Sequence, residues 1–374
     1  MPRPRFAPSW PEGAILIGFL GVLALIPLPD GNESRGTIGA FTVALGTLIL
    51  LSGVRRGALF AGLSAVPAPV LQPLALLLLA GVAVAWQMGA DPADEPGTAP
   101  VRMILCGAMF FLAFGLSQAA GGPQRLIAAI AAIAGVYAVL GLAIGALEWS
   151  EVVAAYRAAA LGHVGGPFLG DQAFALFAGL GGACALAMTA WCGDAGRRRP
   201  ALLWAGAAGF LCVVVGLADA AATAGMLALS GLIIVSRRPG RAAALTPLLL
   251  AGIAAAAWPA LAGPLTRLGT LGDLAQLLVW LAFTPVLLVC LRGCAAPGET
   301  GLFARLGIAV APFALIGAGA GDGIGAPAAI ADFAVVMGVC GAVVLRGHRP
   351  EAASASENRH HAPLRASSAP QSGV

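Results

Sequence analysis

The sequence predicts an all-α polytopic membrane protein, a bundle of about twelve transmembrane helices with both termini in the cytoplasm. Three observations predict it. Of the 374 residues, 59% are hydrophobic and 10% are charged, and the mean hydropathy is +0.90, which excludes an ordinary water-soluble domain. Apolar segments of roughly 20 residues, the length that crosses about 30 Å of hydrocarbon, recur along the chain. Arginine is concentrated in alternate loops between these segments.

Twelve segments are long and apolar enough to be read as transmembrane helices. In chain order they are residues 13–28, 37–54, 69–88, 103–120, 126–146, 173–191, 201–217, 221–236, 242–261, 275–291, 303–318 and 327–345. The piece 58–66 is too short to cross a bilayer and precedes Pro67, so we expect it to lie at the interface. Alanine and 52 glycines dominate the composition. Because small residues let helix backbones approach closely, we expect tight packing between the helices.

The distribution of arginine provides an independent test of this count, because cytoplasmic loops retain basic residues while acidic residues are nearly indifferent to orientation. Each of the 21 basic residues is Arg. Seventeen lie in the even-numbered loops and the two tails, at positions 3, 5, 55, 56, 125, 197, 198, 199, 237, 238, 241, 292, 305, 346, 349, 359 and 365. The odd-numbered loops hold Arg35, Arg102, Arg157 and Arg267. This alternation predicts that the even loops are cytoplasmic and that the odd loops face the periplasmic side of a bacterial inner membrane.

The segments on either side of the helices predict three regions. Residues 1–12 form a short cytoplasmic segment, and no convincing cleavage site follows the first apolar segment, so we expect that helix to be retained. Residues 13–345 form the twelve-helix membrane domain. Residues 346–374 are rich in Ser, Ala, Pro and Arg and predict a disordered cytoplasmic tail. The pair His360 and His361 in this tail has no further ligand nearby, so no metal site is predicted.

The sequence excludes several function classes by the motifs that it lacks. It has no Gly-x-x-x-x-Gly-Lys-Ser/Thr loop and no soluble domain to hold one, so we expect no ATP-driven mechanism, no cofactor and no nucleic-acid partner. The seven cysteines lie in predicted helices or at their cytoplasmic ends and lack the spacing of a zinc or redox site. Cys290 and Cys294 are one helical turn apart and are expected to pack in the core.

Polar residues on the odd-loop side are the candidates for a functional site. The segment GHVGGPFLGDQAFALFAGL, residues 162–180, places His163, a Gly-Gly-Pro turn, Asp171 and Gln172 directly before a long apolar run. The other candidates on this side of the membrane are Arg157, Asp219, Arg267 and Asp322.

Each candidate also has a purely structural interpretation. Arg157 follows Tyr156 and lies near Glu151, so an ion pair at the interface explains it equally well. His163 fits a loop-capping role, and Asp171 at the start of a helix is a natural N-cap. Asp219 fits a turn.

Asp332 is the acidic residue that falls inside a predicted helix, where a carboxylate is expensive and often functional. It is about one turn from the outer end of that helix, so we expect its carboxylate to reach water.

The segment 165–190, GGPFLGDQAFALFAGLGGACALAMTA, resembles the part of the O-antigen ligase and O-antigen polymerase family in which a Gly-x-Phe turn and a small-aromatic pair lead into a transmembrane helix. The matching positions are Gly166, Pro167, Phe168, Ala173 and Phe174. Three later segments are also similar to parts of that family: an Ala/Leu helix ending in cytoplasmic Arg, a Trp-bearing helix after the large periplasmic loop, and a Gly-rich turn before the last helix. They are residues 217–238, 267–289 and 317–339.

The chain departs from the family pattern at three places. Asp219 and three alanines stand where the family carries Ser-Arg-Gly, and Gln276 and Leu277 stand where it carries an Arg before the Trp. Gly170, Asp171 and Gln172 replace an Asn-rich step. These departures remove cations that would hold a lipid pyrophosphate.

The resemblance implies transfer of a glycan from an undecaprenyl-pyrophosphate donor to an acceptor sugar at the periplasmic face, without a metal. Arginine forks would stabilise the pyrophosphate leaving group, which makes Arg157 and Arg267 the candidate clamps. His163 is the candidate base, with Asp171 and Asp219 as further catalytic candidates. Gln172 and Asp322 complete the set as substrate-binding candidates.

Two other classes remain open beside a glycosyltransferase. A solute or lipid-linked glycan transporter fits the topology, but transporters usually place ionisable groups near mid-membrane, where these helices carry almost none. A non-catalytic membrane scaffold, or a catalytically degenerate relative of the family, fits both the topology and the missing arginines.

Overall fold

The computed structural model describes residues 10–26, 42–51, 99–118, 121–146, 171–217, 221–235, 271–319 and 327–347. Within these ranges the chain is helical, with short turns and no β-strand, which confirms the all-α prediction. Three of the described helices are long and apolar enough to cross a membrane: Gly122–Ala143, Phe174–Asp194 and Arg198–Leu217. The chain therefore carries the features of a membrane protein. The count of about twelve spans and the orientation of the termini stay predictions from the sequence.

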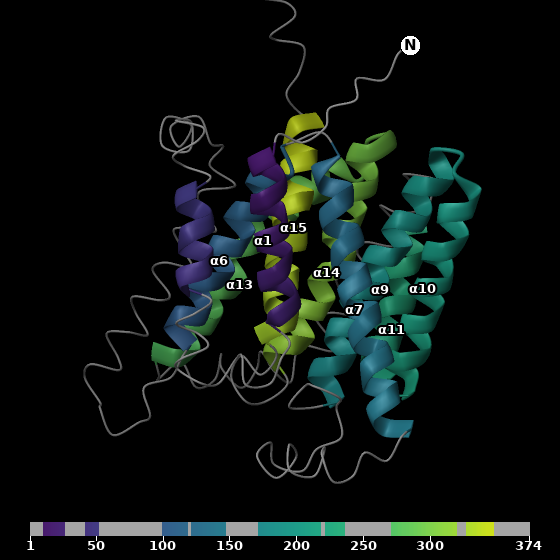
Figure 1. Ribbon diagram of the computed structural model, residues 1–374, viewed down its shortest axis with the longest axis horizontal. Helices are drawn as coiled ribbons and strands as arrows, with labels where there is room; N and C mark the ends of the chain where they lie inside the picture. Colours follow the sequence, from purple (N-terminus) through teal and green to yellow (C-terminus); the bar gives the residue numbers. More distant parts are fainter. Residues whose placement is uncertain are drawn as a thin grey trace, which may run out of the picture.

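The helices run roughly side by side as a bundle (Figure 1). They are α1 (Trp10–Leu25), α6 (Ala99–Leu116), α7 (Gly122–Ala146), α9 (Asp171–Asp194), α10 (Arg198–Leu217), α11 (Ala221–Val235), α13 (Leu271–Gly293), α14 (Gly298–Gly319) and α15 (Pro327–Gly347). A further apolar helix covers Thr42–Leu51. The predicted spans 69–88 and 242–261 lie outside the described residues, as do the segment 58–66 and the tail after residue 347.

Several helices begin or end a few residues beyond their predicted apolar spans. The helix α14 begins at Gly298 rather than at residue 303, and α9 continues to Asp194 rather than ending at residue 191. Backbone hydrogen bonding continues into the polar residues that flank an apolar run, so hydropathy alone underestimates helix length. The first turn of α14 also contains Glu299, whose negative charge is favourable at a helix N-terminus.

The helix α9 lies at the centre of the described bundle. It packs against α7, α10, α11, α14 and α15, and 78% of its membrane-spanning window is buried. In α10, 22% of the corresponding membrane-spanning window is buried. On that helix Leu202 and Leu203 are 73% and 76% exposed, and leucines exposed to this extent on an apolar helix are the natural lipid-facing residues of a bilayer protein. The helix α10 is therefore at the edge of the bundle.

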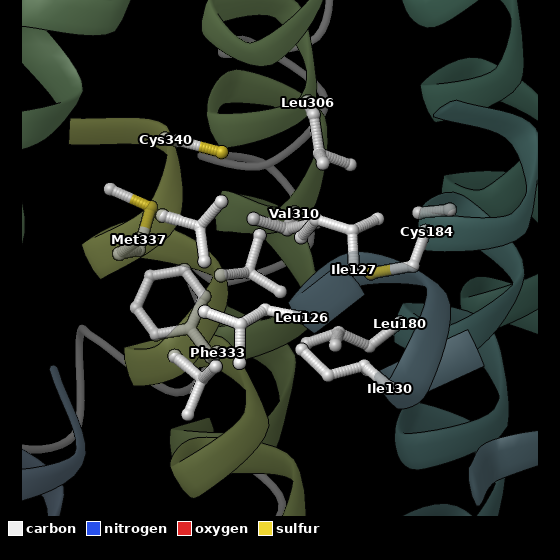
Figure 2. Close-up of a cluster of buried hydrophobic side chains, with 14 of the residues drawn as sticks. Leu126, Ile127, Ile130, Leu180, Cys184, Leu306, Val310, Phe333, Met337 and Cys340 are labelled. Carbon is white, nitrogen blue, oxygen red and sulfur yellow. The ribbon is translucent and has the colours of Figure 1, made fainter. Parts of the chain in front are cut away.

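A continuous hydrophobic cluster fills the interior of the described bundle, and the members labelled in Figure 2 come from four of the helices. It is built from branched aliphatic, aromatic and sulfur-containing side chains. The labelled members are Leu126, Ile127 and Ile130 of α7, Leu180 and Cys184 of α9, Leu306 and Val310 of α14, and Phe333, Met337 and Cys340 of α15.

Glycines allow three of the closest helix contacts. A Cβ placed on Gly338 of α15 would lie 2.5 Å from the carbonyl oxygen of Phe110 on α6. A Cβ on Gly307 of α14 would lie 2.7 Å from Cys290 Sγ on α13. A Cβ on Gly181 of α9 would overlap the methyl group of Ala134 on α7. A larger residue at any of these positions would force the helices apart. The expectation of close packing through small residues is confirmed at these contacts.

Polar contacts fix which helix ends lie together. At the start of α7, Gln124 Nε2 donates a hydrogen bond of 2.8 Å to Glu299 Oε1 at the start of α14. The guanidinium of Arg346, at the end of α15, donates to the carbonyl of Ser117, just after α6. Asp194 at the end of α9 interacts electrostatically with Arg305 of α14.

These contacts define one end of the bundle, which we name the arginine end. Here α6, α9 and α15 finish and α7 and α14 begin (the upper end in Figure 1). The short turns that lead from α9 to α10 and from α13 to α14 lie at the same end. Its basic residues are Arg125, Arg197, Arg198, Arg199, Arg292, Arg305 and Arg346. All seven belong to the even loops or the C-terminal tail of the sequence prediction, so the helix arrangement agrees with the sorting of arginine.

Candidate functional site

Two of the sequence-predicted site residues, Asp171 and Gln172, belong to the end of the bundle opposite the arginine end. Asp171 and Gln172 are the first two residues of α9, the helix that finishes at the arginine end. The start of α9 at Asp171 agrees with the expectation that the segment 162–170 leads directly into a transmembrane helix. His163, Arg157, Asp219, Arg267 and Asp322 lie outside the described residues. Their convergence on one cavity stays a prediction.

Three helices that adjoin the candidate residues meet at Gly179 of α9. A Cβ on Gly179 would lie 2.6 Å from Phe313 Cε1 of α14 and 3.2 Å from Thr223 Cγ2 of α11. Both of these neighbours are buried, with 1% of each side chain exposed. The helices α9, α11 and α14 are therefore in van der Waals contact at one level.

This junction is close in the chain to three of the predicted site residues. Asp171 precedes Gly179 by eight residues, which corresponds to about 12 Å along a helix. Asp219 precedes Thr223 by four residues, and Asp322 follows Phe313 by nine. Asp171 and the chain segments that carry Asp219 and Asp322 consequently adjoin helices that touch one another.

The helix α13, which follows Arg267, packs against α14 of this group and makes aromatic contacts with α15 and α6. Phe283 lies with its ring centroid 5.1 Å from Phe333 of α15 at an interplanar angle of 74°, and 5.7 Å from Phe110 of α6 at 65°. Edge-to-face pairs of this kind are favourable. They fix α13 against α15, and Arg267 is four residues before the first residue of α13.

The polar group that sequence reasoning placed wrongly is Asp332. It was expected to reach water near the outer end of the last helix, but its side chain is 2% exposed. Its Oδ2 atom is buried and has no hydrogen-bond partner among the described residues. Residues 331–344 of α15 are all buried, so this helix is covered on every side. In the sequence, a helix that is apolar on every face predicts that its residues are buried on every side.

Two other polar groups in the interior have partners and serve structural roles, whereas Ser117 Oγ and Gln124 Oε1 at the arginine end have no hydrogen-bond partner among the described residues. Ser230 Oγ of α11 donates a hydrogen bond of 2.7 Å to the carbonyl of Ala309 on α14. Tyr137 Oη of α7 donates one of 2.6 Å to the carbonyl of Ala24 on α1. Hydrogen bonds between transmembrane helices commonly involve such hydroxyl groups. Asp332 differs from Ser230 and Tyr137 because the interior leaves one of its oxygens unpaired.

The described cysteines are all free thiols, and six of the seven are buried. Cys290 and Cys294 are 0% and 8% exposed, which agrees with the expected packing role. No group of three or more His, Cys, Asp or Glu side chains in the described ranges has an arrangement that could hold a metal ion.

Comparison of the chain with protein-family models, with curated proteins and with solved structures finds no match. The resemblance to the O-antigen ligase and polymerase family stays a prediction from the residues.

Proposed function

We propose that this is a multi-pass protein of the bacterial inner membrane that acts in surface polysaccharide assembly. In this proposal it transfers a glycan from an undecaprenyl-pyrophosphate donor to an acceptor sugar at the end opposite the arginine end. The observation that supports the proposal is the contact of α9, α11 and α14 at Gly179, Thr223 and Phe313. The segments carrying His163, Asp219 and Asp322 adjoin these three helices. Their contact therefore allows a single site between the helix ends that lie opposite the arginine end.

The transfer forms one bond and breaks another at the anomeric carbon of the donor. The acceptor hydroxyl oxygen bonds to this carbon, the bond to the pyrophosphate oxygen breaks, and undecaprenyl pyrophosphate leaves. We assign the hydroxyl proton to His163, with Asp171 and Asp219 as neighbouring carboxylates. Arg157 and Arg267 would stabilise the charge on the leaving pyrophosphate, and Gln172 and Asp322 would bind sugar hydroxyls. The chemistry needs no metal.

The test is glycan transfer in membranes that contain the protein and its lipid-linked donor. We expect His163→Ala and Arg267→Ala each to abolish transfer at an unchanged level of folded protein. Loss of one pyrophosphate clamp costs on the order of 3 kcal/mol of transition-state stabilisation, or about a hundredfold in rate. The matched control is Arg198→Ala at the arginine end, where the side chain is exposed.

The outcomes separate the site from its alternatives. Full transfer by both variants would refute the assigned site. Inactive wild-type protein, with surface polysaccharide unchanged when the gene is deleted, would refute the enzyme and favour a non-catalytic scaffold.

A membrane transporter of a solute or of the lipid-linked glycan is the second candidate function. The observation that favours it is Asp332, since ionisable residues buried between transmembrane helices commonly line transport and proton pathways. Transport of the lipid-linked glycan across vesicle membranes, with no new glycosidic bond formed, would favour the transporter over the glycosyltransferase.

A further inference from the structure

Asp332 is the one buried acidic residue among the described side chains, and it shares the lack of a hydrogen-bond partner with two neutral oxygens at the arginine end, Ser117 Oγ and Gln124 Oε1. The residue is 2% exposed, and its buried Oδ2 has no partner among the described residues. The buried oxygens of Ser230 and Tyr137, by contrast, donate to backbone carbonyls. A buried charge without a partner is far more costly than a buried neutral polar group. The environment of Asp332 thus strongly favours a neutral carboxyl over a carboxylate.

The groups around Asp332 offer no compensating positive charge within the described part of the chain. Five helices pack against α15, and each has a titratable side chain among its described residues: Cys106 of α6, Tyr137 of α7, Cys184 of α9, Cys290 of α13 and Arg305 of α14. Cys184 is the one that interacts electrostatically with Asp332.

Three arginines with described side chains belong to these five helices, Arg125 of α7, Arg292 of α13 and Arg305 of α14, and all three lie at the arginine end. Arg125 and Arg292 are exposed there, and Arg305 is half-buried. Arg305 lies in the second turn of α14, and its Nε donates to the carbonyl of Gly301. On α15 itself, Cys340 lies eight residues beyond Asp332, and Arg346 at the far end donates to Ser117.

The position of Asp332 along α15 gives it a short path to one side of the membrane domain. It is five residues from Pro327, where α15 begins, which corresponds to about 7 Å of helix. The arginine end, at Gly347, is fifteen residues away, or about 22 Å. A proton would therefore enter or leave from the end opposite the arginine end.

We propose that Asp332 is a proton-binding site of this membrane domain, neutral in the resting state and able to exchange its proton with water at the end opposite the arginine end. A proton is the ligand that this site fits. Metal cations such as Na⁺ or Ca²⁺ require several oxygen ligands, whereas a proton requires the carboxylate alone. The inference holds for either function proposed above.

Carbodiimide labelling tests the protonation state directly. A hydrophobic carbodiimide reacts with a protonated carboxyl: the acid proton passes to one nitrogen, and the carboxyl oxygen bonds to the central carbon. An acyl shift then gives a stable N-acylurea, and nothing is lost or oxidised. With the full-length protein in lipid vesicles, N,N′-dicyclohexylcarbodiimide should modify Asp332 at neutral pH, as read by mass spectrometry of the digested protein. The yield should fall as the pH is raised.

Matched variants assign the adduct. Asp332→Asn keeps the shape of the side chain and should lose the adduct, and Asp332→Glu should retain it. Asp194→Asn removes an exposed carboxylate at the arginine end and should leave the labelling unchanged. An unlabelled Asp332 in a protein that also lacks the infrared band of a protonated carboxyl would overturn the proposal, because the carboxyl would then be ionised.

Infrared spectroscopy separates an exchanging site from an inert buried acid. Wild-type protein should show the C=O stretching band of a protonated carboxylic acid, and Asp332→Asn should lack it. The band should shift within minutes of transfer to D₂O. Failure to shift would overturn the exchange with water. If Asp332→Asn does not fold, the D₂O shift and the labelling of the wild-type protein still decide the question.

Discussion

Gly338 on α15 lies directly against the backbone of Phe110 on α6, so closely that a Cβ on the glycine would be 2.5 Å from the Phe110 carbonyl oxygen. The same Cβ would be 3.2 Å from both Ala113 Cβ and Phe114 N. The approach of these two helices therefore depends on the missing side chain. This is the tightest point of a contact that also brings Arg346 to Ser117 at the arginine end.

We expect Gly338→Ala to destabilise the protein, because the added methyl group must push the helices apart against backbone atoms. Overpacking of this kind typically costs about 1–3 kcal/mol, measurable as a lower Tm in detergent. The control is Gly209→Ala on the exposed face of α10, where nothing lies within 4 Å of the added Cβ. That change should be neutral or slightly stabilising. Equal effects of the two variants would contradict the proposed close contact.

The Ser230 hydroxyl should contribute modestly to stability. Ser230→Ala removes its hydrogen bond to Ala309 and leaves that carbonyl in the α14 backbone. Hydrogen bonds between transmembrane helices average about 0.6 kcal/mol, so the free energy of unfolding should fall by about that amount. Thr47→Ala is the control: Thr47 is exposed and bonds within its own helix to the Val43 carbonyl. A larger loss at Thr47 than at Ser230 would show that the α11–α14 bond is not formed.

The sorting of arginine predicts which side of the membrane each end faces. In a cysteine-free background, a membrane-impermeant maleimide added outside should label Asp94→Cys and Gly165→Cys but not Arg198→Cys. Arg198 is exposed at the arginine end, so its thiol should react once the membrane is opened. External labelling of Arg198→Cys in intact cells would reverse the orientation and move the proposed site to the cytoplasmic side.

The Gln124–Glu299 hydrogen bond predicts a cross-link between the beginnings of α7 and α14. In the same background, a short bis-maleimide should join Gln124→Cys to Glu299→Cys with high yield. The control pair, Gln124→Cys with Leu217→Cys, places the second thiol at the end of α10, far from the arginine end. A cross-link in the control pair but not in the first would mean that the two helices do not start at the same end.

The sequence predicted the helices well because a bilayer leaves the backbone few choices. Each backbone amide in hydrocarbon must be hydrogen-bonded within the chain, so a long apolar segment becomes a helix. The described helices α7, α9, α10 and α15 match their predicted spans to within four residues at either end. The positions of the arginines also predicted which helix ends lie together. Charged side chains are excluded from the hydrocarbon, so the arginine-rich loops gather on one side of the membrane.

The tertiary structure alone decided which helix faces pack together and which residues are enclosed. In a water-soluble protein an apolar stripe marks the buried face of a helix, but here the lipid and the protein interior are both apolar. Leu202 and Leu203 of α10 are exposed, while the equally apolar Leu176 and Leu180 of α9 are buried. Nothing in their immediate sequence separates the two cases.

Asp332 shows the consequence most clearly. Its distance from the start of α15 was evident in the sequence, and that distance suggested contact with water. Its burial depends on α14, the preceding helix, and on α6, α7, α9 and α13, which come from more distant parts of the chain. The sequence by itself determined that this is an all-helical membrane protein with its arginines sorted to alternate loops, because hydropathy and charge act on each segment separately. Only the tertiary structure decided that a carboxyl group lies in its interior, because burial depends on neighbours that no single segment encodes.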